Sequence, residues 1–108
     1  MSSTQERVAL CNVDDVPEGS AVKVDVDDLE LAVFNTQGRI FVTDDQCTHG
    51  AASLSEGFVE GCRVICDLHE GAFDLETGEA VAPPCILPIK TYRAIVEDGV
   101  VFIDLPSS

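Results

Sequence analysis

Two short motifs, each pairing a cysteine with a histidine, constrain this chain more than any other feature. The first is Cys47-Thr-His49-Gly, and the second is Cys66-Asp-Leu-His69-Glu-Gly. Both histidines of the chain lie in these motifs, and residues 50–65 separate them. Thiolates and imidazoles are ligands for thiophilic metals. A fold that brings the two motifs together therefore creates a site with four metal ligands.

The rest of the sequence has the pattern of a β protein. Val22, Val24 and Val26 alternate with Lys23 and Asp25, which predicts a half-buried strand. The residue types of several other runs also favour strands, and no helix of any length is predicted. These runs are residues 7–12, 29–35, 39–43, 58–59, 63–66, 71–75, 87–97 and 100–105.

Turn residues join these runs into hairpins. Asn35-Thr36-Gln37-Gly38 forms one connection, Glu60-Gly61 a second and Asp98-Gly99 a third, which is the strongest hairpin signal in the chain. The first strand, near the N-terminus, is expected at a sheet edge. Residues 46–57 read as a loop, and residues 82–85 contain two prolines and cannot donate a regular ladder of hydrogen bonds. The hairpins place each Cys/His motif at a tip.

Size, charge and cysteine content exclude several classes of protein. A chain of 108 residues is expected to form one domain. The net charge of −14 opposes binding to nucleic acid or to an anionic membrane surface. An odd set of five cysteines with no apolar leader argues against a disulfide framework, so we expect a cytoplasmic protein with reduced thiols. The three cysteines outside the motifs read as small hydrophobic residues: Cys11, Cys62 and Cys85.

The residues leave two kinds of metal site open. A structural zinc module uses cysteine and histidine ligands, but zinc fingers usually pair two cysteines in one motif and two histidines in the other. Mixed motifs fit a site with two metal atoms better, because each loop then contributes one ligand to each metal. A [2Fe–2S] cluster with two histidines on one iron has this ligand set. A catalytic Cys/His dyad is disfavoured, since nothing marks a nucleophile with an orienting third group.

The two motifs and the gap between them resemble the Rieske motif, and the run from Cys66 to Asp74 resembles the ferredoxins of bacterial aromatic-ring-hydroxylating dioxygenase systems. The resemblance implies an all-β Rieske fold. A β-sandwich-like base would be formed by residues 1–44 and 86–108, with a cluster-binding subdomain of two hairpin loops inserted at about residues 45–85. The cluster ligands implied are Cys47 and Cys66 on the inner iron, with His49 and His69 on the outer iron. Pro83-Pro84 matches the family's loop that covers the cluster.

The resemblance also implies a function and partners. The chain would be a one-electron carrier, not an enzyme, with one Rieske-type [2Fe–2S] cluster. It would take electrons from an FAD-containing, NADH-dependent ferredoxin reductase and pass them to a terminal non-haem-iron dioxygenase, and it would bind no small-molecule substrate. The alternatives are the zinc-binding module and an electron-transfer component of a monooxygenase or of another reductase complex.

Departures from respiratory Rieske proteins predict the character of the cluster. The positions of their extra disulfide cysteines hold Ala52 and Leu68, and those of their serine and tyrosine hydroxyl donors hold Gly71 and Phe73. With fewer donors to sulfur, the potential is expected toward the low end of the roughly −150 to +300 mV Rieske range. Between residues 40 and 89 a single base, Arg63, stands among many acids, which read as a solubilising surface. Two acids beside the second histidine are the candidates for partner docking: Asp67 and Glu70.

Overall fold

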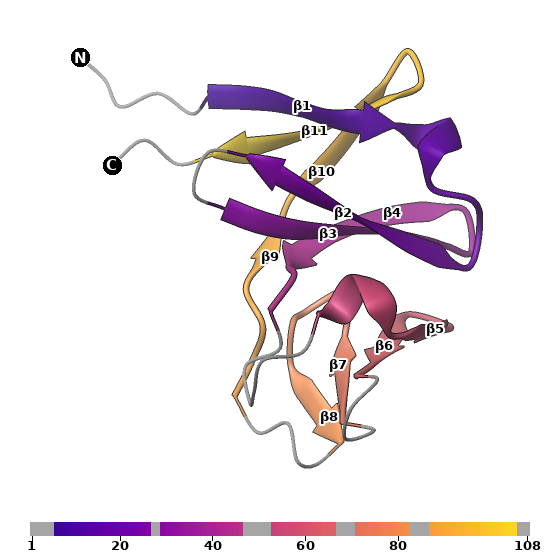
Figure 1. Ribbon diagram of the computed structural model, residues 1–108, viewed down its shortest axis with the longest axis vertical. Coiled ribbons are helices and arrows are strands. Elements are labelled where there is room, and N and C mark those ends of the chain that lie inside the picture. Colours follow the sequence, from indigo (N-terminus) through magenta and orange to yellow (C-terminus); the bar gives the residue numbers. More distant parts are fainter. Residues whose placement is uncertain (1–5, 27–28, 47–52, 67–70, 83–86, 106–108) are drawn as a thin grey trace.

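The computed structural model describes residues 6–26, 29–46, 53–66, 71–82 and 87–105, which form three antiparallel sheets (Figure 1). Two single-turn 3-10 helices accompany them, and no α-helix occurs in these ranges. The elements in chain order are β1 (Glu6–Asn12), η1 (Val13–Asp15), β2 (Ser20–Val26), β3 (Leu29–Thr36), β4 (Arg39–Asp44), η2 (Leu54–Glu56), β5 (Phe58–Glu60), β6 (Arg63–Ile65), β7 (Ala72–Asp74), β8 (Ala80–Ala82), β9 (Thr91–Tyr92), β10 (Ala94–Glu97) and β11 (Val100–Leu105). The all-β prediction is confirmed.

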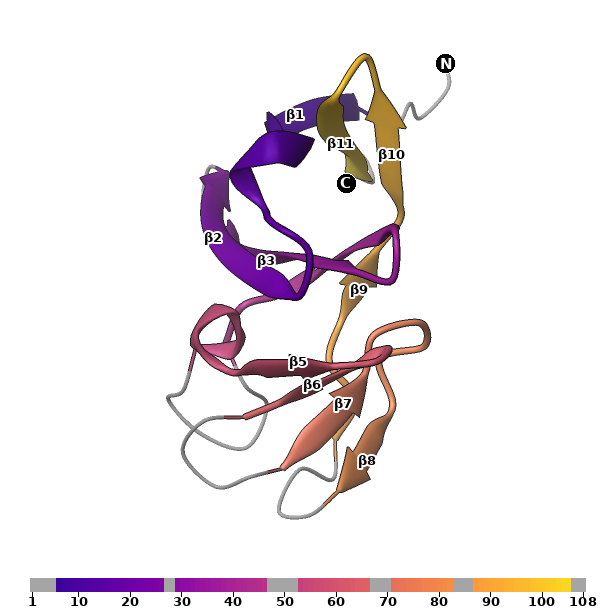
Figure 2. The same ribbon diagram turned by 90° about the vertical axis from the view of Figure 1, so that its right-hand side faces the viewer.

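Two of the sheets are built from both ends of the chain. One has the strand order β1-β11-β10, and the other has the order β2-β3-β4-β9. The expected edge position of the first strand is confirmed, because β1 pairs with β11 alone. The third sheet, β5-β6-β7-β8, lies below the other two in Figures 1 and 2.

Strand β3 is buried on both faces and connects two cores. Leu31 and Val33 point into a cluster that includes Val101 and Ile103 of β11. The alternate residues Ala32 and Phe34 point into a second cluster with buried side chains of the third sheet. Because successive side chains of a strand face opposite sides, the sheet that contains β3 is the middle layer. The third sheet is therefore packed against a sheet whose central strand is buried on both faces.

Two polar contacts also join the third sheet to the β3–β4 hairpin. The Thr36 hydroxyl donates to the carbonyl oxygen of Gly61 at 2.7 Å, and Thr36 is buried. The Arg39 guanidinium lies 2.8 Å from the carboxylate of Glu76, with both side chains largely exposed. The hydrogen bond from Thr36 therefore fixes the turn between β5 and β6, while the Arg39–Glu76 ion pair is exposed to solvent.

The hairpin predictions were close to the observed turns. Thr36 pairs with Arg39, so the turn is the two residues Gln37-Gly38 and not the four predicted, and both have positive φ. Asp98-Gly99 is confirmed as a hairpin turn with positive φ at both residues. This geometry matches the right-handed twist of the flanking strands.

Two strand predictions need correction. Residues 87–97 do not form one strand, because β9 covers only Thr91–Tyr92 and a separate β10 begins at Ala94. β8 was not predicted, and it pairs with β7 through an irregular register.

In the described part of the chain, no helix is long and apolar enough to cross a membrane.

Candidate metal centre

One of the four predicted ligands, Cys66, is described by the structure. The other three lie outside the described residues, and so do the predicted docking acids and the proline pair: Cys47, His49, His69, Asp67, Glu70, Pro83 and Pro84. Accordingly, no group of three or more potential metal ligands occurs within the ranges that the structure covers. The centre is therefore built here from Cys66 and from the residues that hold the ends of the two ligand segments.

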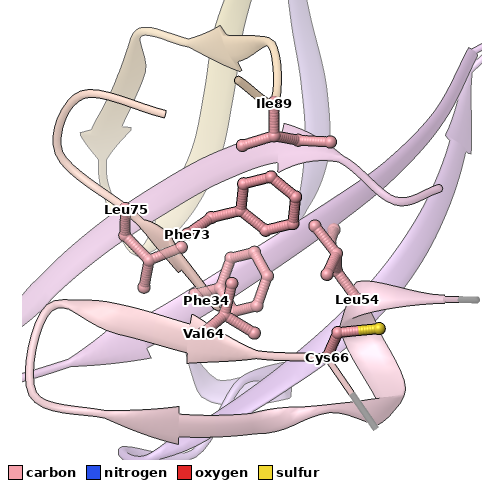
Figure 3. Close-up of a cluster of buried hydrophobic side chains, with 8 residues drawn as sticks. Phe34, Leu54, Val64, Cys66, Phe73, Leu75 and Ile89 are labelled. Carbon is pink, nitrogen blue, oxygen red and sulfur yellow. The ribbon is translucent and has the colours of Figure 1, made fainter. Parts of the chain in front are cut away.

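Cys66 follows β6 directly and is buried, with 1% of its surface exposed. Its side chain belongs to the cluster of Phe34, Val64 and Phe73 (Figure 3). The backbone N–H of Cys66 donates to the carbonyl oxygen of Gly71 at 2.6 Å. This bond closes the segment 67–70 at its base, so the second motif begins from a fixed position.

The first motif is closed at its base by contacts of Ser53, Leu54 and Ser55 with Asp45 and Gln46. Gln46 and Ser53 form an antiparallel bridge, and the N–H of Leu54 donates to the carbonyl oxygen of Asp45 at 2.7 Å. The hydroxyl of Ser53 donates to the Asp45 carboxylate, and the N–H of Ser55 donates to it at 2.8 Å. The segment that contains Cys47 and His49 therefore has two fastened ends.

The bases of the two segments are packed together. Leu54, at the exit of the first segment, and Cys66, at the entry of the second, are buried members of one cluster. Figure 3 shows them at the same end of that cluster, away from Leu75. Gly57 fits this contact because a Cβ there would overlap the carbonyl oxygen of Ile65. The exit of the first ligand segment and the entry of the second therefore lie at the same end of the third sheet.

The chemistry of this donor set fits an iron–sulfur centre. Cys66 is a buried member of an apolar cluster, with 1% of its surface exposed, so little water reaches its sulfur atom. Two thiolates and two imidazoles complete the four ligands of a Rieske-type cluster. Phe73 is fully buried in the same apolar cluster, and neither Phe73 nor Gly71 carries a hydroxyl group. A cluster held here thus gains no side-chain hydroxyl donor from these two positions.

Asp44, beside Asp45, is fastened to the base of the molecule. The hydroxyl of Tyr92 donates to its carboxylate at 2.7 Å, and its N–H donates to the carbonyl oxygen of Lys90 at 3.0 Å. Burial, together with the hydrogen bond to the negative Asp44, raises the pKa of Tyr92. The phenol thus remains protonated and keeps donating at neutral pH.

Asp45 corrects the sequence-based interpretation of the acids. It was counted with a solubilising surface, but it is buried, with 2% of its surface exposed. The local signal is an aspartate followed eight residues later by Ser53-Leu-Ser55, because these residue types form side-chain bonds to backbone N–H groups. A single sequence gives no measure of burial for such a residue.

Comparisons with known proteins give a family and close relatives. Residues 6–93 match the Rieske [2Fe-2S] domain. A ferredoxin component of naphthalene 1,2-dioxygenase/salicylate 5-hydroxylase systems from a Ralstonia species is 44% identical over 95 residues, which cover 88% of this chain and 91% of that protein.

Two solved structures are similar over the same length. The Sphingomonas yanoikuyae B1 ferredoxin has a TM-score of 0.89 and 46% identity, covering 94% of this chain and 100% of that one. A chain from the complex of reduced oxygenase and oxidized ferredoxin in carbazole 1,9a-dioxygenase has a TM-score of 0.85 and 33% identity, covering 94% of this chain and 95% of that one. The likeness thus extends through all three sheets.

Proposed function

Because this chain belongs to the Rieske [2Fe-2S] domain family, we propose that it carries single electrons within an aromatic-ring-hydroxylating dioxygenase system. It would accept them from an FAD-containing, NADH-dependent ferredoxin reductase and deliver them to the terminal non-haem-iron oxygenase. The observation that carries this proposal is the 44% identity to a dioxygenase ferredoxin component over most of both chains. The complex of oxygenase and ferredoxin in carbazole 1,9a-dioxygenase supports the oxygenase partner.

The cofactor is a Rieske-type [2Fe–2S] cluster, which rules out the zinc alternative. When bound, such a cluster supplies one reversible one-electron change. We assign Cys47 and Cys66 to the inner iron, and His49 and His69 to the outer iron. The burial of Cys66 and the closed base of the second segment support this assignment. Fixed segment ends would help to keep the ligands in place when the cluster changes its oxidation state.

The third sheet supports a division of the chain into two parts. Residues 45–85 would form the cluster-binding subdomain, inserted into a base formed by residues 1–44 and 86–108. Strands β5 to β8 make a sheet of their own, packed on Phe34 of the base. The free thiols of Cys11 and Cys62 support the cytoplasm as the compartment, because thiols stay reduced there. Substrate specificity would belong to the oxygenase.

Reconstitution tests the proposed function. Purified reductase and oxygenase with NADH and an aromatic substrate are expected to form hydroxylated product only when this protein is added, at a rate that rises with its concentration. Reduction of the protein by NADH and reductase, followed by visible absorbance, tests the first half separately. Reduction without any product in the presence of a competent oxygenase would contradict the second half.

A hydroxylase is the second candidate for the electron acceptor. The Ralstonia relative is named as the ferredoxin component of both a naphthalene 1,2-dioxygenase and a salicylate 5-hydroxylase system. The same assay with a ring-hydroxylating monooxygenase in place of the dioxygenase separates the two. Faster turnover with the monooxygenase, at equal protein concentration, would favour this candidate over the dioxygenase.

A further inference from the structure

We propose that Asp45 is a positioning residue that fixes the first ligand segment through its buried carboxylate. The inference rests on the proposed function, because it takes Cys47 and His49 as ligands of the cluster. Asp45 itself would not touch the iron. Its role would be to hold the two ends of segment 46–53 at one separation, so that both ligands keep their place relative to Cys66.

Asp45 forms hydrogen bonds through both its backbone and its side chain. Its carbonyl oxygen accepts from Leu54 N at 2.7 Å, and its carboxylate accepts from the Ser53 hydroxyl and from Ser55 N. In the other direction, Asp45 N donates to the carbonyl oxygen of Glu30 at 2.8 Å. One residue thus joins the exit of the segment to its entry, and joins both to β3.

The buried setting of the Asp45 carboxylate makes these bonds important. Within the described ranges no cation forms an ion pair with Asp45, and the ion pairs of the neighbouring Lys23 are with Asp25 and Glu30. The buried carboxylate therefore depends on the Ser53 hydroxyl and the Ser55 amide. A buried acceptor that loses its hydrogen-bond donors is strongly destabilised. Losing them leaves the Gln46–Ser53 bridge and the bond from Leu54 N to the Asp45 carbonyl oxygen to close the segment.

The hydrogen bonds of Asp45 affect more than the loop that they close. Leu54 packs in the same buried cluster as Cys66, so a shift of residues 53–55 is transmitted to the second motif as well. Residues that orient metal ligands without touching the metal typically change metal affinity or activity by about 10- to 100-fold when replaced. An effect on the cluster, and not on stability alone, is therefore the expected signature.

The test compares Asp45→Asn with Asp74→Asn in the cluster-loaded protein. Asp74 lies at the far end of β7, and its carboxylate also accepts from a backbone N–H, that of Glu76, at 2.8 Å. The two substitutions change charge and shape equally. Iron release to a chelator, followed by the loss of visible absorbance, is expected to be about tenfold faster for Asp45→Asn. The EPR g-values of the reduced protein are expected to shift for Asp45→Asn alone.

A second variant covers the case in which Asp45→Asn does not fold. Ser53→Ala removes one donor to the carboxylate and leaves the charge in place, so a smaller acceleration of iron release and a smaller g-value shift are expected. In the double variant the two effects should not add, because both substitutions alter the same contact between residues 45 and 53. If the effects of the two substitutions on iron release were fully additive, Asp45 and Ser53 would not act through a shared contact, and the inference would be overturned.

Three results would overturn the inference. These are unchanged iron release and EPR in Asp45→Asn, equal changes in Asp74→Asn, or a loss of stability with no change at the cluster. Failure of the proposed function is recognised separately, since the wild-type protein would then lack the Rieske signal or fail to transfer electrons. A normal wild type with an inert Asp45→Asn variant would remove only the positioning role.

Discussion

The hydroxyl of Tyr92 donates a 2.7 Å hydrogen bond to the carboxylate of Asp44. Tyr92 lies on β9, which follows the third sheet in the chain, and Asp44 ends β4, which precedes it. The bond therefore joins the chain before the ligand segments to the chain after them. It stabilises the base of the molecule next to Asp45.

Replacing Tyr92 with phenylalanine tests this bond. The aromatic ring can stay in its apolar cluster, so the free energy of unfolding is expected to fall by about 1.5–3 kcal/mol, from the lost hydrogen bond to a charged group. Urea unfolding of the cluster-loaded protein measures the change. Thr91→Val, at the exposed neighbouring position, is the control and should be nearly neutral. An unchanged midpoint in Tyr92→Phe would show that the bond does not stabilise the fold.

The same bond predicts a pH dependence. Burial and then the contact with Asp44 raise the pKa of Tyr92 above its ordinary value of 10.0. Above about pH 10 the unfolded chain loses the phenolic proton while the folded chain keeps it, so the free energy of unfolding should fall as pH rises. Tyr92→Phe should lack this part of the fall. Tyr92 is the single tyrosine, so tyrosinate absorbance reports its titration directly. Identical pH profiles for both proteins would contradict the pKa shift.

Gly57→Ala tests the packing between the two ligand segments. A Cβ at Gly57 would overlap the carbonyl oxygen of Ile65, the residue before Cys66. Overpacking of this kind costs about 1–3 kcal/mol, and we expect an altered EPR line shape as well. Gly61→Ala is the control, because its cost of about 1 kcal/mol comes from a left-handed φ and its Cβ would meet no neighbouring atom. Equal EPR spectra for the two variants would count against the coupling.

Thr36→Val tests the junction between the base and the third sheet. The substitution keeps the shape and removes the buried donor to the carbonyl oxygen of Gly61. Unfolding should become easier by about 1–3 kcal/mol, the cost of leaving a buried acceptor unpaired. Arg39→Gln removes the exposed ion pair with Glu76 at the same junction and should have a much smaller, salt-screened effect. The reverse order in a urea titration would contradict this account.

Much of the fold could be predicted from local patterns. The two-residue turns at Gln37-Gly38 and Asp98-Gly99 need positive φ, and glycine at the second position signals it in the sequence. The alternation in β2 depends on one face being buried, which leaves a period of two. The Cys/His spacing predicted the family, and the match over residues 6–93 confirms it.

Other features depend on contacts between distant residues. β8 is short and precedes two prolines, so its strand geometry comes from pairing with β7 and not from local preference. The separation of β9 from β10 arises because they belong to different sheets. Asp45 is buried because the chain folds back and brings Ser53 and Ser55 into contact with its carboxylate. A count of charged residues in the sequence cannot predict this contact.

The reduction potential is expected toward the low end of the Rieske range of about −150 to +300 mV. Gly71 and Phe73 bring no hydroxyl group to the cluster, so the added charge of the reduced state is less stabilised. A redox titration followed by EPR measures the midpoint. A value well above zero would contradict the expected lack of side-chain donors.

The assignment of the ligands is tested most directly by the EPR spectrum of the dithionite-reduced protein, with Cys66→Ser and Cys62→Ser beside the wild type. Cys62 is a free, half-buried thiol in the turn between β5 and β6, so its replacement controls for the loss of a sulfur atom. The wild type and Cys62→Ser should give a Rieske-type signal with about two irons per chain. Cys66→Ser should lose the signal and its iron. A normal Rieske signal in Cys66→Ser would contradict the assignment.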